Sequence, residues 1–140
     1  MIHYKETRLI ADKDLRPLYE SEGWASYYEG FDDLQVILKD CKLVYSAWDK
    51  EKLVGLVRTI GDGVYIQHVQ DLIVLPDYQK RGIGVELMRY VFAKSENIRK
   101  LVLITDGSEE NRYILDWYKR QGLLPFEEMG LVGFAMEKRS

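Results

Sequence analysis

The feature that most constrains the fold is a strand, a loop, a helix and a second strand in the middle of the chain. Val64 to Leu75 has the pattern of a long strand ending at Pro76, and Gly82 to Lys94 carries apolar residues at helical spacing. Leu101 to Thr105 is a short apolar run, typical of a strand buried on both faces. This order is that of a βαβ unit, so we expect the two strands to run parallel.

Shorter patterns on both sides of this unit predict the other elements. Three runs rich in β-branched and aromatic residues, separated by tight turns, predict an antiparallel meander that includes the long strand. No linker or repeat divides the chain, so we expect a single domain over residues 1–140. The predicted fold class is α/β (α+β), with a mixed central sheet of about six or seven strands and about four helices. The other predicted strands are Ile2–Thr7, Leu43–Trp48, Leu53–Ile60, Leu124–Glu128 and Leu131–Glu137, and the other helices are Asp12–Glu20, Asp32–Lys39 and Glu109–Gly122.

The composition excludes several classes of protein. The sequence has 20 basic and 23 acidic residues and a formal net charge of -3, without the basic excess of a nucleic-acid-binding surface. No apolar run approaches the roughly 20 residues that span a bilayer, and the N-terminus lacks the apolar core of a signal peptide. Cys41 is the only cysteine, so no intrachain disulfide can form. We expect a cytoplasmic protein that binds neither nucleic acid nor a membrane.

The segment Gln79 to Gly84, between the long strand and its helix, has the properties of a phosphate-binding loop. The first N–H groups of a helix have no intrahelical acceptor, and the helix dipole adds partial positive charge there. Gly82 and Gly84 remove side chains that would keep a phosphate from the backbone, and the neighbouring Lys80 and Arg81 add positive charge. The loop therefore suits a diphosphate, although glycines that only shape a turn would give the same short pattern.

Two commoner phosphate motifs do not fit the sequence. There is no G-x-x-x-x-G-K-[ST] segment, which excludes a P-loop. Leu87 stands where the third glycine of G-x-G-x-x-G/A would be, so the dinucleotide fingerprint is incomplete. A Rossmann-type dinucleotide site is therefore excluded as well.

The longer string Val74 to Gly84 resembles motif A of the GNAT superfamily of N-acetyltransferases. The family pattern is Val-x-Pro-x-x-[Arg/Gln]-x-x-Gly-x-[Gly/Ala], and every fixed position matches. A second, weaker match lies downstream, where Asn111, Tyr118 and Gly122 fit the family's Asn-x-x-Ala-x-x-Phe-Tyr-x-x-x-Gly-Phe. The departures exchange one apolar residue for another, so no chemical group is lost: Ile114 for Ala, Trp117 for Phe and Leu123 for Phe.

The resemblance covers essentially the whole chain and implies a reaction, the transfer of an acetyl group from acetyl-CoA to an amine. In this family the strand before the loop pairs with the pantetheine arm, and a backbone N–H there, that of Val74 or its neighbour, polarises the thioester carbonyl. The implied cofactor-binding residues are Leu72, Ile73 and Val74 for the pantetheine arm, Gln79, Lys80, Arg81, Gly82, Ile83 and Gly84 for the pyrophosphate, and Asn111 for the cofactor arm.

The resemblance also implies that Tyr118 protonates the departing thiolate. The leaving thiol has a pKa of about 8.5, like that of cysteine, so a tyrosine hydroxyl is a reasonable but not obligatory acid. Helical periodicity alone favours a core aromatic beside Trp117, and only the register of the family motif favours the acid role of Tyr118.

A general base is needed because the attacking amine must be neutral. Strand alternation places His68 and Gln70 on one face and Asp71 on the other. In the family register, His68 falls where the histone-acetylating branch has a glutamate and the arylalkylamine-acetylating branch a histidine, and an ordinary pKa of about 6.5 suits the task. Asp71 is the second candidate base, and both residues are also explained as strand residues with structural hydrogen bonds.

The resemblance implies that the first two helices and the late strands, here including Met129 to Phe134, supply the acceptor side. The main candidate region lies between the first two helices. Its aromatic residues can bind a flat or apolar amine, or can instead cover the core beneath the loop. Acidic residues nearby can attract a cationic amine or form a solvated face. The candidate substrate-binding residues are Trp24, Tyr27, Tyr28 and Phe31, and the acidic residues are Glu20, Glu22 and Glu29.

Two functions of different classes follow from these patterns. One is an enzyme that acetylates the primary amine of a small molecule or, as an alternative, of a peptide or protein. The other is a non-catalytic module that binds CoA. The presence of Tyr118 and His68 favours the enzyme. We predict no metal site, and the resemblance implies that late strands can pair into a homodimer.

Overall fold

The computed structural model describes residues 1–137, apart from the side chains of Ser26 and Tyr27. The chain divides into two compact units, one from Met1 to Ile104 and one from Thr105 onward, and each is described by itself. The α-helices are α1 (Asp12–Glu22), α2 (Ala25–Tyr28), α3 (Ile83–Lys94) and α4 (Arg112–Arg120), and the 3₁₀ helices are η1 (Leu34–Leu38), η2 (Pro76–Tyr78), η3 (Glu109–Asn111) and η4 (Phe126–Met129). The strands are β1 (Ile2–Glu6), β2 (Leu43–Asp49), β3 (Lys52–Gly61), β4 (Ile66–Val74) and β5 (Lys100–Leu103).

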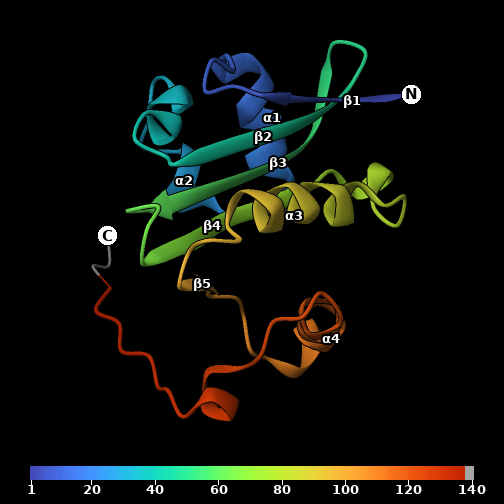
Figure 1. The fold of residues 1–140 in the computed structure, drawn as a ribbon. Coiled ribbons are helices and arrows are strands. Elements are labelled where there is room, and N and C mark those ends of the chain that lie inside the picture. The colour runs from blue at the N-terminus through green and yellow to red at the C-terminus, as the bar shows by residue number, and fades with distance from the viewer. Residues whose placement is uncertain (138–140) are drawn as a thin grey trace. The chain divides into compact units, whose positions relative to one another are not determined.

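The first unit is built on one sheet with the strand order β1-β2-β3-β4-β5 (Figure 1). The first four strands are antiparallel neighbours, and β5 runs parallel to β4 after the crossover through α3. The predicted meander and βαβ unit are therefore confirmed, and the sheet is mixed. β5 is half-buried rather than buried on both faces, because it is the edge strand of the described sheet.

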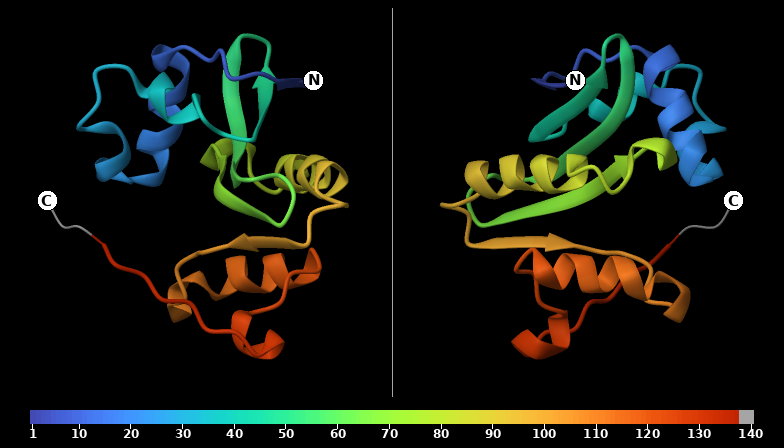
Figure 2. Two further views of the ribbon diagram at one scale, coloured as in Figure 1. Left: turned by 60° about the vertical axis from the view of Figure 1, so that its left-hand side comes forward. Right: turned by 90° about the vertical axis from the view of Figure 1, so that its right-hand side faces the viewer.

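Helix α1 and the 3₁₀ helix η1 cover one face of the sheet, as the views in Figure 2 show. The predicted helix over Asp32–Lys39 is this shorter 3₁₀ helix, which begins after Asp33, whose carboxylate accepts from the Gln35 N–H. Apolar side chains from α1, η1 and the strands interlock in one core, which buries the sheet face from water. Its fully buried members include Leu15, Leu18, Tyr19, Leu34, Leu38, Leu56 and Ile73.

Helix α3 packs on the opposite face of the sheet. Its apolar stripe, formed by Ile83, Leu87, Met88 and Val91, is fully buried. Gly55 of β3 lies directly beneath it, and a Cβ atom there would meet Ile83 at 3.1 Å. The close fit of α3 to β3 sets the position of the loop that precedes the helix.

A β-bulge interrupts the pairing of β3 with β4. Arg58 lies opposite Asp71, and the next residue, Thr59, lies opposite Val69, so Gln70 has no residue opposite it. Because side chains directly opposite in an antiparallel pair share a face, the bulge exchanges the faces of β4 on its two sides. Asp71 therefore shares a face with Arg58, and Val69 shares the other face with Thr59.

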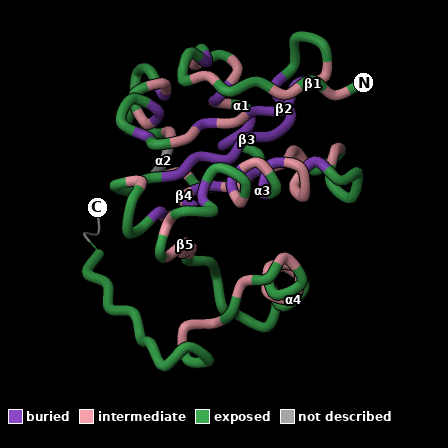
Figure 3. Tube along the Cα trace, viewed as in Figure 1, coloured by how far each residue is buried: buried purple, intermediate pink, exposed green. Residues whose placement is uncertain are grey.

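The second unit contains η3, α4 and η4. The two predicted closing strands, Leu124–Glu128 and Leu131–Glu137, are wrong for this structure, which has no strand after β5 within residues 1–137. Part of the first forms η4, and Gly130 then adopts a left-handed conformation with φ of 73°. Residues 131–137 are exposed (Figure 3), and an alternating apolar pattern makes a strand only where a neighbouring strand accepts its backbone hydrogen bonds. The sheet thus has five strands in place of the expected six or seven.

Candidate active site

The two parallel strands of the βαβ unit separate partway along their length. β4 and β5 pair only from Ile66 opposite Lys100 to Val69 opposite Leu103. β4 then continues to Val74 with β3 on one side and no described strand on the other. The segment Gln70 to Val74 therefore presents an open backbone edge, which can accept an extended ligand as an additional strand.

The hydrogen-bonding groups on this open edge can be assigned from the pairing with β3. The Leu75 N–H donates to the Val54 carbonyl at 2.9 Å. Alternation along an antiparallel pair then turns the N–H and C=O groups of Leu72 and Val74 away from β3. The Val74 carbonyl accepts a hydrogen bond from the Gln79 side chain at 3.0 Å, which leaves the N–H groups of Leu72 and Val74 as donors on the edge.

The loop after β4 contains a run of unused backbone donors. Backbone hydrogen bonds stop at the Gln79 N–H, which donates to Pro76, and resume at the Glu86 N–H, which donates to Gly82. Between them, the N–H groups of residues 80–85 donate to no acceptor in the described part of the chain. These groups lie at and just before the N-terminus of α3, where the helix dipole is positive. Such a run is a ready anion site.

Gly82 shapes this run of donors. It caps α3 with φ of 84°, a left-handed conformation that favours glycine, and a Cβ atom at this position would meet no atom within 4 Å. The missing side chain therefore leaves open space over the loop rather than room for a protein neighbour. Lys80 and Arg81 are exposed, and the Arg81 guanidinium lies 4.9 Å from the centre of the Tyr78 ring. Both positive charges remain available to an anion.

The candidate bases His68 and Asp71 lie on the same face of the sheet, and the prediction from alternation was wrong. His68 lies opposite Ile60, and Asp71 lies opposite Arg58, two residues earlier on β3. Side chains two residues apart on a strand point to the same face, so the bulge at Gln70 brings both candidates to the α1 side. No residue pattern in β4 signals this bulge.

Asp71 is bound in a buried network. Its Oδ2 atom accepts hydrogen bonds from the Arg58 Nε at 2.5 Å and from the Tyr19 hydroxyl at 2.7 Å. Asp71 is 2% exposed and Arg58 is 7% exposed. Burial, together with the negative charge of Asp71, raises the pKa of Tyr19, so its hydroxyl stays protonated and donates. A buried carboxylate that accepts from two such donors stabilises the fold and is poorly placed to accept a proton from a substrate. His68 is therefore the better candidate for the general base.

Arg58 and Tyr19 also belong to this network, although no motif in the sequence marks them. Arg58 is the one charge within the apolar run Leu53 to Ile60, and a strand of this kind needs a buried partner for such a charge. That signal was present in the sequence. The identity of the partner was not, because Tyr19 and Asp71 are 52 residues apart.

His68 is half-buried on β4. Burial lowers the pKa of its imidazole, the Asp71 carboxylate raises it, the Arg58 guanidinium lowers it, and the result is a pKa below the ordinary value. At neutral pH the imidazole is therefore mostly unprotonated. This is the protonation state that can accept a proton from an ammonium group.

The aromatic residues predicted to bind the acceptor differ in how far they are buried. Tyr28 packs against the α1-side core, whereas Trp24 and Phe31 are 37% and 42% exposed. Tyr27 belongs to α2, and its side chain lies outside the described residues. The Arg16 guanidinium donates to the carbonyl oxygens of Tyr28 and Phe31, both at 2.8 Å. These bonds hold the end of α2 and the residues after it against α1.

Asn111 and Tyr118 belong to the second unit. The Asn111 amide donates to the Asp106 carbonyl at 2.6 Å at the start of α4. Tyr118 is half-buried in α4, and its ring meets the Trp117 ring edge-on with centroids 5.3 Å apart. The helix ends as predicted near Gly122, which has φ of 98°.

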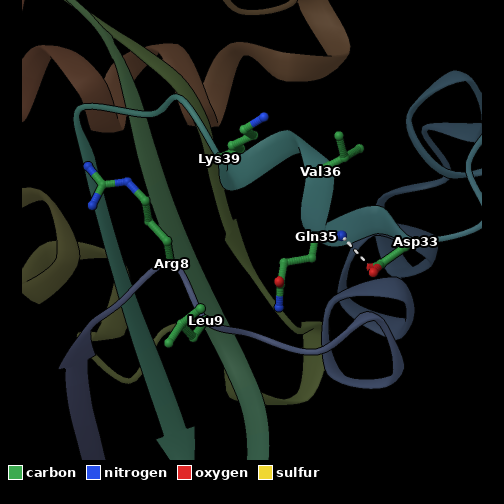
Figure 4. Close-up of a pocket in the computed structure, with 6 residues that line it drawn as sticks. All are labelled: Arg8, Leu9, Asp33, Gln35, Val36 and Lys39. Carbon is green, nitrogen blue, oxygen red and sulfur yellow. Dashed lines mark hydrogen bonds between the residues drawn. The ribbon is translucent and has the colours of Figure 1, made fainter.

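A surface pocket of about 400 Å³ lies elsewhere in the first unit, beside η1 (Figure 4). Two of its polar side chains form hydrogen bonds within the fold: Arg8 donates to the Cys41 carbonyl, and the Gln35 amide donates to the Ile10 carbonyl. None of the predicted site residues lines it. The lining residues are Arg8, Leu9, Asp33, Gln35, Val36 and Lys39.

Two other kinds of feature are absent from residues 1–137. No group of three or more His, Cys, Asp or Glu residues in this range is arranged to hold a metal ion. No helix in the same range has the length and apolar character of a membrane span.

Comparison with known proteins identifies the family to which the chain belongs. Residues 40–122 match the family model described as an acetyltransferase (GNAT) domain, which covers more than half of the chain. The chain therefore belongs to the GNAT family of acetyltransferases, and the resemblance drawn from Val74 to Gly84 is confirmed.

Individual relatives support this assignment. A GNAT family acetyltransferase from Streptococcus pneumoniae superimposes with a TM-score of 0.84 and 31% identity over 100% of both chains. An uncharacterised N-acetyltransferase of Prochlorococcus marinus is 27% identical over 85% of this chain, which spans 66% of that protein's length. An aminoglycoside N-acetyltransferase solved in complex with CoA shares the fold, with a TM-score of 0.69 and 16% identity over 100% of this chain and 95% of its own.

Proposed function

We propose that the protein transfers the acetyl group of acetyl-CoA to a primary amine of a small molecule. The observation that carries this proposal is the run of unused N–H donors in residues 80–85, directly after the open edge of β4. A diphosphate fits the first feature, and an extended amide-containing arm fits the second. CoA contains both groups in this order.

The residues fit the cofactor as follows. Gln79 to Gly84 hold the pyrophosphate through backbone N–H groups, with Lys80 and Arg81 adding charge. The edge Leu72 to Val74 pairs with the pantetheine arm, and Asn111 binds the same arm by the family register. Bound acetyl-CoA supplies an acetyl group activated as a thioester.

The Val74 N–H donates a hydrogen bond to the thioester carbonyl of acetyl-CoA. Attack by an amine builds negative charge on the thioester oxygen, and a fixed backbone donor aimed at it stabilises the transition state by about 3 kcal/mol. Val74 provides such a donor because its N–H lies on the open edge and its strand is fixed by pairing with β3. Leu72 provides the second donor on this edge.

His68 accepts the proton of the attacking amine, directly or through water, and this role predicts a specific pH dependence. Because burial lowers the pKa of His68, the pH profile of kcat/KM should rise below about pH 6.5, where the imidazole loses its proton. Deprotonation of the amine substrate should produce a second rise of kcat/KM at about pH 10. In the variant His68→Gln the lower limb should disappear, whereas His3→Gln, at an exposed histidine, should keep it. A lower limb that survives in His68→Gln would assign it to another group.

Tyr118 protonates the departing thiolate. The variant Tyr118→Phe should keep the fold and lower kcat about tenfold, a modest effect because a thiol with a pKa of about 8.5 leaves readily. The matched control is Tyr113→Phe on the same helix, because Tyr113 is 67% exposed and the substitution should not change kcat. Equal kcat values for the two variants would remove Tyr118 from the mechanism.

The acceptor is proposed to be a small molecule because two partly exposed aromatic residues, Trp24 and Phe31, flank helix α2, whose last carbonyl is bound by Arg16. Two structural relatives are aminoglycoside acetyltransferases, whose acceptors are small cationic amines. The test is release of free thiol from acetyl-CoA across a panel of polyamines, arylalkylamines, aminoglycosides, amino acids and peptides. Release only with peptides would move the acceptor to proteins, and no release with any amine, despite acetyl-CoA binding, would favour a non-catalytic CoA-binding module.

A further inference from the structure

Glu22, the last residue of α1, is placed differently from the other acidic residues nearby. It follows the buried residues Leu18 and Tyr19 by four and three positions, so it lies on the same face of the helix. Glu20 and Glu29 are exposed, whereas Glu22 is half-buried. Of the three acidic side chains in this region, two are therefore solvated, and only that of Glu22 is partly buried against the first unit.

The surroundings of Glu22 disfavour its negative charge in three ways. Burial and the negative charge of Asp71 both raise the pKa of the Glu22 carboxyl. The C-terminal end of a helix carries partial negative charge, and the last turn of α1 contains no basic residue. Arg58 is already paired with Asp71, so it does not balance the additional charge. Within residues 1–137 no hydrogen bond or ion pair is formed by the Glu22 side chain.

An aromatic surface lies at the C-terminal end of α1. Trp24, two residues after Glu22, is 37% exposed, and its ring contacts the Tyr19 ring with centroids 6.5 Å apart. Trp24 therefore packs on Tyr19, which shares a helix face with Glu22. A carboxylate next to a partly exposed indole is a common arrangement for an ammonium group, which gains both an ion pair and a cation–π contact. A bound cation would also offset each of the three unfavourable interactions of Glu22.

We infer that Glu22, with Trp24, binds a positively charged group of the acceptor, so that the preferred substrates are amines with a second cationic centre. The inference rests on the proposed function. The group held by Glu22 is not the one that is acetylated, because a carboxylate stabilises the protonated form of an amine, and the attacking amine must be neutral. Diamines and polyamines satisfy both requirements in one molecule, with one ammonium for Glu22 and a second amine for the reaction.

The test compares matched monoamines and diamines, pentylamine with cadaverine and benzylamine with xylylenediamine, in acetyl-CoA thiol release. The wild-type protein should prefer the diamine in kcat/KM at least about tenfold, which corresponds to about 1.4 kcal/mol. Glu22→Gln should remove this preference through KM for the diamine, with kcat and the monoamine values unchanged. Glu20→Gln is the matched control, because Glu20 is exposed on the same helix, and it should retain the preference.

The stability of the variants provides a second readout. Glu22→Gln should leave the Tm unchanged or raise it, because the substitution removes an unfavourable charge without altering the shape. A fall in Tm with an equal loss for both substrate types would identify a structural role and overturn the inference. Equal use of monoamines and diamines by the wild-type protein would overturn the inference alone, and absence of turnover with every amine of the panel would overturn the proposed function together with it.

Discussion

Replacing Asp71 with asparagine is expected to lower the free energy of unfolding by about 3–5 kcal/mol, the cost of leaving a buried arginine without its counter-ion. Arg58 is 7% exposed, and its Nε atom donates to the Asp71 carboxylate at 2.5 Å. Its other partners include the Ile37 carbonyl at 3.1 Å and the Cys41 sulfur at 3.6 Å, neither of which carries a balancing charge. Urea denaturation of the wild-type protein and the variant measures the difference directly.

Two further variants separate the charge from the hydrogen bonds. Tyr19→Phe removes the neutral donor to Asp71 and should cost about 1–2 kcal/mol. The double variant Arg58→Met with Asp71→Leu removes both charges and should be more stable than Asp71→Asn, because no ion remains buried alone. A double variant as unstable as Asp71→Asn would mean that packing, rather than the ion pair, determines the loss.

Replacing Gly82 with valine is expected to weaken acetyl-CoA binding at least about 100-fold, or about 2.7 kcal/mol, the value of one to two hydrogen bonds to a charged group. The side chain would enter the open space at Gly82, which lies within the run of unused N–H donors of residues 80–85. A diphosphate would then be held away from these donors. Titration calorimetry with acetyl-CoA measures the change in Kd.

The control for this experiment is Gly23→Val. Gly23 also adopts a left-handed conformation, with φ of 72° against 84° for Gly82, and a Cβ atom at Gly23 would likewise meet no atom within 4 Å. The two substitutions therefore carry similar backbone strain, about 1–2 kcal/mol each. Both variants should lose similar stability, and only Gly82→Val should lose acetyl-CoA affinity. Equal losses of affinity would attribute the effect to strain alone.

The central part of the fold was predictable because its signals are local. The strand before Pro76, the glycines of the loop and the apolar stripe of α3 each depend on residues close in sequence, and the parallel crossover follows from their order. The loop could also be interpreted chemically, because helix N-terminal donors bind anions in any fold.

The predictions that failed depended on pairing between distant segments. The faces of His68 and Asp71 were assigned by alternation, which holds only where no bulge intervenes, and the bulge at Gln70 appears only in the register with β3. The closing strands were predicted from apolar alternation at Leu131 to Glu137, a pattern that does not specify a hydrogen-bonding neighbour.

The candidate site was predicted only in part for the same reason. The cofactor loop was found from its own residues, whereas the network of Tyr19, Arg58 and Asp71 joins α1, β3 and β4. Asp71 was a candidate base because it lies on the same predicted strand as His68. Its two buried donors show that position along a strand does not reveal which side chains are already engaged.

The most direct test of the proposed cofactor site is an NMR titration of the ¹⁵N-labelled protein with acetyl-CoA, in which each backbone N–H is observed separately. We predict that the N–H signals of residues 80–85, which have no acceptor among residues 1–137, move on binding together with those of Leu72 and Val74. S-acetylpantetheine, which lacks the diphosphate, should move only the signals of the β4 edge. Binding of acetyl-CoA that leaves the signals of residues 80–85 unchanged would contradict the assignment of this loop as the diphosphate site.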